Sequence, residues 1–153
     1  MKIKHLNIQV QKLDIIVISD IHSHQDYMNK LAEHVRNNGL NFDYCFVGGD
    51  IVNCDHNHKT HNEEKETEAF RNIMLFLHDL FQCKIIFVPG NHDPLIYING
   101  EPSITPDILN LHKKEYVLEF GLSIVGLGGS LPGYNDINYK NKVWEGYTYQ
   151  SEE

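Results

Sequence analysis

Three short groups of polar residues carry side chains that can bind metal ions or transfer protons. They are D-I-H at 20–22, G-G-D at 48–50 and G-N-H-D at 90–93. Carboxylate, imidazole and amide groups are costly to bury and add nothing to a hydrophobic core. Mixed oxygen and nitrogen donors of this kind suit Mn²⁺, Fe or Zn²⁺ better than Ca²⁺ or a thiolate cluster. The three groups are therefore candidates for a metal site.

Each group directly follows an apolar segment that is typical of a buried strand. The segments are LDIIVIS at 13–19, DYCFV at 43–47 and KIIFV at 84–88. The first is predicted to be a buried strand, and the β-branched and aromatic residues of the third suit a strand covered on both faces. Parallel strands of an α/β sheet present their carboxyl ends at one edge, where ligands bind. Each group alone also fits an ordinary polar turn, but three groups at one edge favour a shared site.

The spacing within and between the groups suggests what the site would do. Side chains two residues apart in an extended segment point the same way, so we expect Asp20 and His22 to face one centre. Asp50, on the middle turn, has two oxygens and can bridge two ions. Paired ions bind a phosphate, neutralise its charge and lower the pKa of a water between them. A neighbouring imidazole can then stabilise or protonate the departing oxygen.

Two helices are expected to connect these strands. The first spans 27–38, with Asp26 as its N-cap and Gly39 at its end. The second spans 63–81, where apolar residues repeat at the three-and-four spacing of a buried stripe and acidic residues fill the first turns. The order strand, helix, strand, helix, strand predicts an α/β fold with a parallel sheet and right-handed crossovers.

The pattern is weaker in the rest of the chain. We expect an edge strand over 3–10, a short helix over 103–111, and a hairpin formed by 115–120 and 122–127. Residues 129–153 form a loop-rich tail with four tyrosines and the only tryptophan. No internal repeat or linker divides the chain, so residues 1–153 are interpreted as a single domain.

The composition excludes some classes of binding partner and indicates a cellular compartment. The formal net charge of -8 argues against a specific nucleic-acid or membrane-surface binder. The three cysteines form no CxxC pair, which indicates free thiols in a reducing compartment. No signal-like or membrane-length apolar run is present in the sequence. We therefore expect a cytoplasmic protein with no membrane partner.

The three groups resemble the first three motifs of the calcineurin-like metallophosphoesterase family in order and in placement after strands. The resemblance covers about residues 13–129, and G-N-H-D is its most specific part. It implies a two-sheet α/β sandwich, a dinuclear metal centre and a phosphoester substrate. It also implies that His92 acts at the leaving group and that Asp93 orients it. For the metals it implies that Asp20 and His22 bind the first ion, Asp50 bridges, and Asn91 binds the second.

The chain departs from the family pattern in two places. Asn53 stands where many members have a second acidic residue. The family's later motifs, a further histidine and a Gly-His-x-His, have no counterpart, because the only histidine after His92 is His112, on the expected short helix. The chain therefore resembles the amino-terminal half of an incomplete sandwich. The second metal site is expected to be incomplete, the activity weak, and the uncovered sheet face a surface for self-association.

Three questions stay open at the level of sequence. The arginines that protein phosphatases of this superfamily carry near the second and third motifs are absent, so the resemblance is to the broader phosphomonoesterase and phosphodiesterase branch. A catalytically impaired scaffold or protein-binding module is the alternative to an enzyme. His56, His58 and His61 lie on a loop after Asp50; they form either a solvated loop or a lid that lends a nitrogen to the site.

Overall fold

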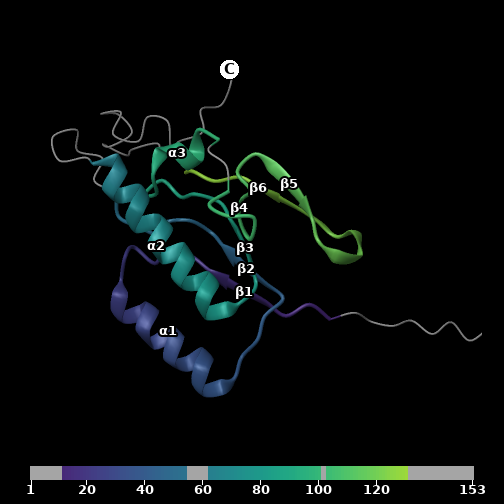
Figure 1. Cartoon of the computed structure of the whole chain (residues 1–153). Helices are drawn as coiled ribbons and strands as arrows, with labels where there is room; N and C mark the ends of the chain where they lie inside the picture. Colours follow the sequence, from purple (N-terminus) through teal and green to yellow (C-terminus); the bar gives the residue numbers. More distant parts are fainter. Residues whose placement is uncertain (1–11, 55–61, 101–102, 131–153) are drawn as a thin grey trace, which may run out of the picture.

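A parallel four-stranded sheet forms the centre of the protein (Figure 1). The computed structural model describes residues 12–54, 62–100 and 103–130. All three neighbouring strand pairs are parallel, as the sequence predicts for the first three strands. The sheet therefore gathers the carboxyl ends of its strands at one edge. In spatial order its strands are β1 (Ile15–Ile18), β2 (Tyr44–Val47), β3 (Lys84–Phe87) and β4 (Ile108–Asn110).

Two helices, α1 (Gln25–Asn38) and α2 (Glu63–Phe81), cover one face of this sheet (Figure 1). The bounds of α2 are those predicted from its apolar spacing, and the Asn62 side chain accepts a hydrogen bond from the Lys65 backbone N–H at its start. The helices and the sheet share one hydrophobic core, whose largest members are fully buried. These include Phe70, Met74 and Leu77 from α2 with Cys45, Ile85 and Phe87 from the strands.

The start of α1 differs from the prediction. The helix begins at Gln25, two residues earlier than expected, and its N-cap is His24, whose side chain makes no capping hydrogen bond. Asp26 lies inside the first turn, where its charge still interacts favourably with the helix dipole. The predicted end is confirmed, since Gly39 adopts a left-handed conformation with φ 57°.

The segment 103–111 contains a short strand and no helix, so the helix predicted there is wrong. Residues Ile108–Asn110 form β4 and pair with β3, and Ile108 is fully buried. A single helical turn, α3 (Leu95–Ile98), follows the third polar group instead. The error arose because a three-residue strand carries too short a pattern to reveal its period. His112 therefore follows a strand end and does not lie on a helix.

The hairpin predicted around Gly121 is confirmed with shorter strands. Strands β5 (Lys114–Val117) and β6 (Ser123–Gly126) pair antiparallel, and a 3₁₀ turn (Glu119–Gly121) joins them. The hairpin lies on the sheet face opposite the helices (Figure 1), where it contributes Tyr116 and Ile124 to a second hydrophobic cluster. It covers that face only in part.

An apolar groove of about 370 Å³ remains between the hairpin and the sheet. Val17, Phe46, Val88, Ile124 and Leu127 are among the residues that line it. The prediction that the first strand is buried is therefore wrong for one of its faces, because Val17 is 70% exposed. The opposite face of β1 does pack on the core, through Ile16 and Ile18.

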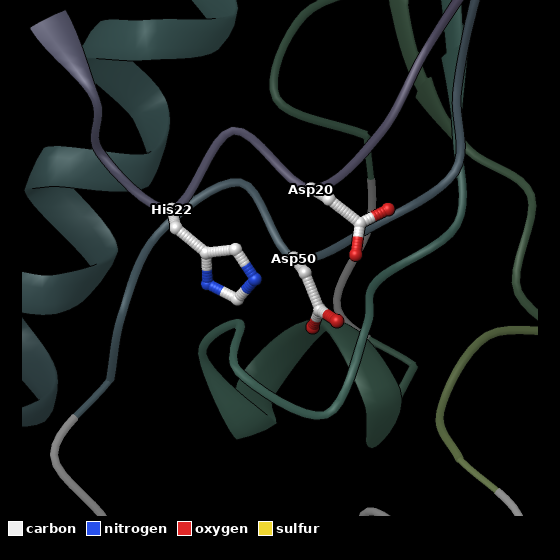
Figure 2. A group of neighbouring side chains, drawn as sticks. All are labelled: Asp20, His22 and Asp50. Carbon is white, nitrogen blue, oxygen red and sulfur yellow. The ribbon is translucent and has the colours of Figure 1, made fainter.

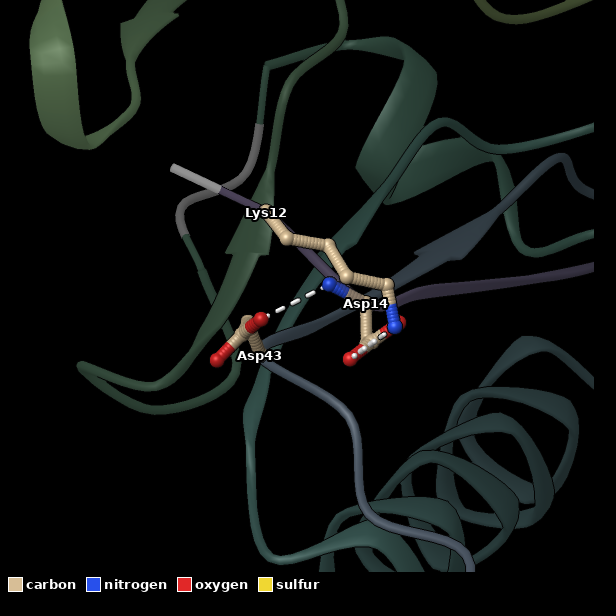
Figure 3. A network of polar contacts seen from close by, with 3 residues as sticks. All are labelled: Lys12, Asp14 and Asp43. Atoms are coloured by element: carbon tan, nitrogen blue, oxygen red, sulfur yellow. Dashed lines mark hydrogen bonds and ion pairs between the residues drawn. The ribbon is translucent and has the colours of Figure 1, made fainter. Parts of the chain in front are cut away.

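The amino-terminal ends of β1 and β2 are joined by reciprocal contacts (Figure 3). The Asp43 backbone N–H donates to the Asp14 carbonyl, and the Asp14 N–H donates to Oδ2 of Asp43, both at 2.7 Å. Lys12 forms an ion pair with Asp14. These contacts fix the register at one end of the strand pair, so the Asp20 and Asp50 turns emerge side by side at the other end.

Several expectations fall outside the part of the chain that the structure describes. The edge strand over 3–10, the three loop histidines 56, 58 and 61, and residues 131–153 of the tail belong to this group. Among the described residues, none of the helices has the length and apolar character needed to cross a membrane.

Candidate metal centre

Asp20, His22 and Asp50 come together at the carboxyl edge of the sheet (Figure 2). One possible ligand atom from each side chain lies within 4.8 Å of the others. Asp20 is exposed, whereas His22 and Asp50 are half-buried. Figure 2 shows one nitrogen of the His22 ring facing the two carboxylates, with the other nitrogen facing away. Two carboxylates and one imidazole make a donor set that suits Mn²⁺, Fe or Zn²⁺.

The backbone reaches this arrangement by a route that differs from the expected one. Asp20, His22 and Ser23 have φ values of 56°, 47° and 58°, so the segment is a left-handed turn and not an extended strand end. The N–H groups of Asp20, His22 and Ser23 donate to the carbonyls of Gly49, Asp50 and Ile51 at 2.9–3.0 Å. The loop after β1 is therefore held against the loop after β2 by backbone hydrogen bonds, and these bonds keep the side chains together.

Glycines allow the loop after β3 to approach Asp50. Gly49 has φ 96°, and a Cβ on Gly49 would lie 2.5 Å from the Gly90 nitrogen. A Cβ on Gly90 would overlap the Asp50 carboxylate and come within 2.5 Å of the Asp50 nitrogen. The backbone N–H of His92 donates to Oδ1 of Asp50 at 2.9 Å. Gly49 and Gly90 thus bring the third polar group into contact with the second.

The imidazole of His92 lies beside the candidate metal ligands. Its ring centroid is 5.1 Å from that of His22, and the two rings are nearly perpendicular at 74°. Burial lowers the pKa of His92, and His22 adds to this effect, whereas the charges of Asp50 and Asp20 oppose it. A lowered pKa favours the neutral imidazole at pH 7. His92 can therefore present one N–H and one lone pair at the edge of the site.

Asp93 braces the loops after β2 and β3. Its carboxylate is fully buried, with Oδ1 accepting from the N–H groups of Ile51 and Val52 at 2.8 and 3.2 Å and Oδ2 accepting from Gly90 at 2.7 Å. Burial raises the pKa of Asp93 to about 7, although the three N–H donors act in the opposite direction. These contacts are to backbone groups, so the orientation of the His92 ring by Asp93 stays a prediction.

Asn91 lies between two residues whose backbones are fixed. Gly90 is bound by Asp93, and the His92 N–H is bound by Asp50. Asn91 itself is half-buried at the same sheet edge. The backbone on either side of Asn91 is therefore tied to Asp93 and Asp50, and the part of Asn91 in binding a second ion stays a prediction.

Two residues that the sequence did not single out as site residues make informative contacts. Oδ1 of Asn53 lies 2.9 Å from Nδ1 of His22. His112, at the end of β4, is 3% exposed, and its Nδ1 accepts a hydrogen bond from the Gly128 N–H at 3.0 Å. The signal for Asn53 in the sequence was its position three residues after Asp50, where many members of the family that the chain resembles have a second acidic residue. Sequence alone offered no signal that it would reach His22.

The family comparison agrees with this geometry. The model of the calcineurin-like phosphoesterase family matches residues 13–151. The chain belongs to the calcineurin-like phosphoesterase family, and its parallel α/β sheet with helices is consistent with that fold. A comparison with curated proteins found no significant match. The divalent ions on which this family depends fit the cluster of two carboxylates and an imidazole.

Proposed function

We propose that the chain is a metal-dependent hydrolase of phosphomonoesters or phosphodiesters. The observation that carries this proposal is the convergence of Asp20, His22 and Asp50 at the carboxyl edge of a parallel sheet, in a chain of this family. These three side chains would hold a divalent ion, Mn²⁺, Fe or Zn²⁺. When bound, such an ion neutralises phosphate charge and lowers the pKa of a water molecule.

His92 supplies a hydrogen-bond donor to the leaving group in this proposal. Its neutral ring has one N–H, which can donate a hydrogen bond to the ester oxygen that departs. As negative charge develops on that oxygen, the hydrogen bond strengthens and stabilises the charge. The ring centroids of His92 and His22 are 5.1 Å apart, so this donor lies at the edge of the candidate metal site. Asp93 keeps the loop that carries His92 fixed against Ile51 and Val52.

The proposal includes a weaker second metal position. Asp50 would bridge and Asn91 would supply an amide oxygen, which is a poor shell for a borderline metal. Within the described residues, Asp20, His22 and Asp50 form the one group of three or more acidic, histidine or cysteine ligands, and His112 is not part of it. We therefore propose weak occupancy of the second position and low turnover.

The test combines metal content with turnover. The purified chain is analysed for bound metal, and hydrolysis of bis(p-nitrophenyl) phosphate and of p-nitrophenyl phosphate is measured with added Mn²⁺. Activity that rises with Mn²⁺ and disappears in Asp20→Asn supports the proposal. Absence of Mn²⁺ binding by the parent chain would refute it. Rapid turnover with two tightly bound ions would refute the weaker second position alone.

A scaffold or protein-binding role is the second candidate, and the apolar groove favours it. Val17 and Val125, on either side of the groove, are 70% and 77% exposed. β1 is an outer strand of the sheet among the described residues. We propose that a second copy of the chain covers this face. Analytical ultracentrifugation should show dimers that Val17→Lys disrupts, whereas a monomeric parent would exclude this occupant.

Two further proposals concern organisation and location. We propose that residues 1–153 fold as one domain, since β1 to β4 form one sheet over a main core and the β5–β6 hairpin packs on the other face of that sheet. We also propose a cytoplasmic location. It is supported by the free thiols of Cys45, Cys54 and Cys83, which a reducing compartment would preserve.

A further inference from the structure

Asn53 and His22 make a direct side-chain contact at the candidate metal centre. Oδ1 of the Asn53 amide lies 2.9 Å from Nδ1 of the His22 ring. This is an ordinary length for a hydrogen bond between an imidazole nitrogen and an oxygen. An amide oxygen only accepts hydrogen bonds, so the hydrogen must be on Nδ1 of His22. The contact therefore selects one of the two neutral forms of the ring.

The selected form is the one that a metal site requires. When Nδ1 of a neutral imidazole carries the hydrogen, Nε2 keeps a free lone pair. Figure 2 shows that the ring nitrogen next to the attachment carbon faces away from the carboxylates and that the other, Nε2, faces Asp20 and Asp50. Histidine ligands in proteins commonly donate their second N–H to an oxygen in this way. Asn53 thus occupies the position of an outer partner of a histidine ligand.

The backbone around Asn53 is held on both sides. The Val52 N–H donates to Oδ1 of Asp93 at 3.2 Å, and the Cys54 N–H donates to the His92 carbonyl at 3.0 Å. Val52 and Cys54 are both buried, whereas Asn53 is exposed. The amide is therefore presented from a fixed loop, even though its side chain lies at the surface. His22 is held in turn through its own N–H, which donates to the Asp50 carbonyl.

We propose that Asn53 is a positioning residue that keeps His22 in the Nδ1–H tautomer and so presents Nε2 to the divalent ion. The part that concerns the ion rests on the proposed function, whereas the tautomer is a property of the metal-free chain. A neutral amide performs this task without adding charge. An aspartate at position 53 would accept the same hydrogen bond.

The test reads the tautomer directly in the metal-free protein. Long-range ¹H–¹⁵N correlation spectra distinguish a protonated from an unprotonated nitrogen in each imidazole ring, and His22→Gln assigns the His22 signals among the ten histidines. The parent should show Nδ1–H at His22. Asn53→Ala should shift the ring toward the Nε2–H form, and the conservative Asn53→Asp should retain the parent pattern. Asn41→Ala is the matched control, because Asn41 is an exposed asparagine that bonds Gly39 away from the site.

Calorimetry with Mn²⁺ adds a second readout. Loss of an outer partner typically weakens metal binding ~10–100-fold, so Asn53→Ala should bind Mn²⁺ more weakly by this factor and Asn53→Asp should not. An Nε2–H ring in the parent, or an unchanged ring in Asn53→Ala, would overturn the inference. A shifted tautomer with unchanged Mn²⁺ affinity would overturn its metal part. The expected tautomers and affinities in a chain that hydrolyses no ester would support the inference while removing the proposed function.

Discussion

The backbone N–H of His92 donates a 2.9 Å hydrogen bond to Oδ1 of Asp50. The carboxylate that is central to the candidate metal site is therefore oriented by the chain itself. Because the donor is a backbone group, replacing the His92 side chain leaves this contact in place. The role of the imidazole can thus be separated from the position of the carboxylate.

We expect His92→Ala to fold, to bind Mn²⁺ as the parent does and to lose turnover. The loss should be about 10²-fold or more, which is typical of removing a hydrogen-bond donor to a developing negative charge. Steady-state hydrolysis and calorimetry on the same samples check the two halves of this expectation. His34→Ala, on the exposed surface of α1, is the control. Parent-like turnover in His92→Ala would remove the imidazole from the mechanism.

Asp50→Ala should weaken Mn²⁺ binding more than Asp20→Ala. It removes a ligand and also leaves the His92 N–H without its acceptor. Loss of a direct ligand should exceed the ~10–100-fold cost typical of losing an outer partner. Calorimetric titration with Mn²⁺ measures the difference. Equal affinities of Asp50→Ala and the parent would contradict the assignment.

Gly90→Ala tests the close approach of the third loop to Asp50. A methyl group there would overlap the Asp50 carboxylate, so we expect a loss of about 1–3 kcal/mol in the free energy of unfolding and weaker Mn²⁺ binding. Gly121→Ala is the matched control, since Gly121 has φ 77° with open space around it. The control should lose stability through backbone strain, about 1–2 kcal/mol, and keep its metal affinity. Equal Mn²⁺ affinities in the two variants would argue against the steric explanation.

Asp93→Ala should destabilise the protein by about 2–4 kcal/mol, because it leaves three backbone N–H groups without their acceptor. These groups belong to Ile51, Val52 and Gly90. Asp93→Asn should cost less, since one oxygen remains. Urea unfolding monitored by circular dichroism gives both values. If both variants unfold like the parent, Asp93 does not brace the two loops.

Burial raises the pKa of the fully buried Cys45 thiol to about 12. The folded chain therefore retains the thiol proton at pH values where the unfolded chain, with an ordinary pKa of 9.0, releases it. The resulting contribution to stability is present below pH 9 and is lost as the pH rises toward 12. The stability gap between the parent and Cys45→Ala, measured in urea, should narrow between about pH 8 and about pH 10. A stability difference that does not change with pH would contradict the raised pKa of Cys45.

Long periodic segments were predictable from the sequence, whereas short ones were not. The α2 bounds followed from the spacing of Phe70, Met74 and Leu77. The β4 strand has three residues, and its pairing with β3 is a long-range contact. The start of α1 was misplaced because Asp26 is a good N-cap by type, although His24 occupies that position.

The candidate site was also predictable only in part. Sheet topology brings Asp20, His22 and Asp50 to one edge, as the strand order predicted. The predicted extended conformation of Asp20 and His22 was wrong, because the left-handed turn depends on hydrogen bonds to the loop after β2, almost thirty positions further along the chain. The contact of Asn53 with His22 spans 31 positions. Interactions at such separations leave no trace in local residue patterns.

The left-handed backbone at Asp20, His22 and Asp50 has an evolutionary consequence. Their φ values of 56°, 47° and 52° are ones that glycine adopts freely and that other residues adopt at a cost of about 1–3 kcal/mol. Glycine at any of these positions would relieve strain and delete a candidate metal ligand at the same time. Selection for stability alone would therefore erode the cluster. These three side chains carry a cost in backbone strain that the fold itself does not require.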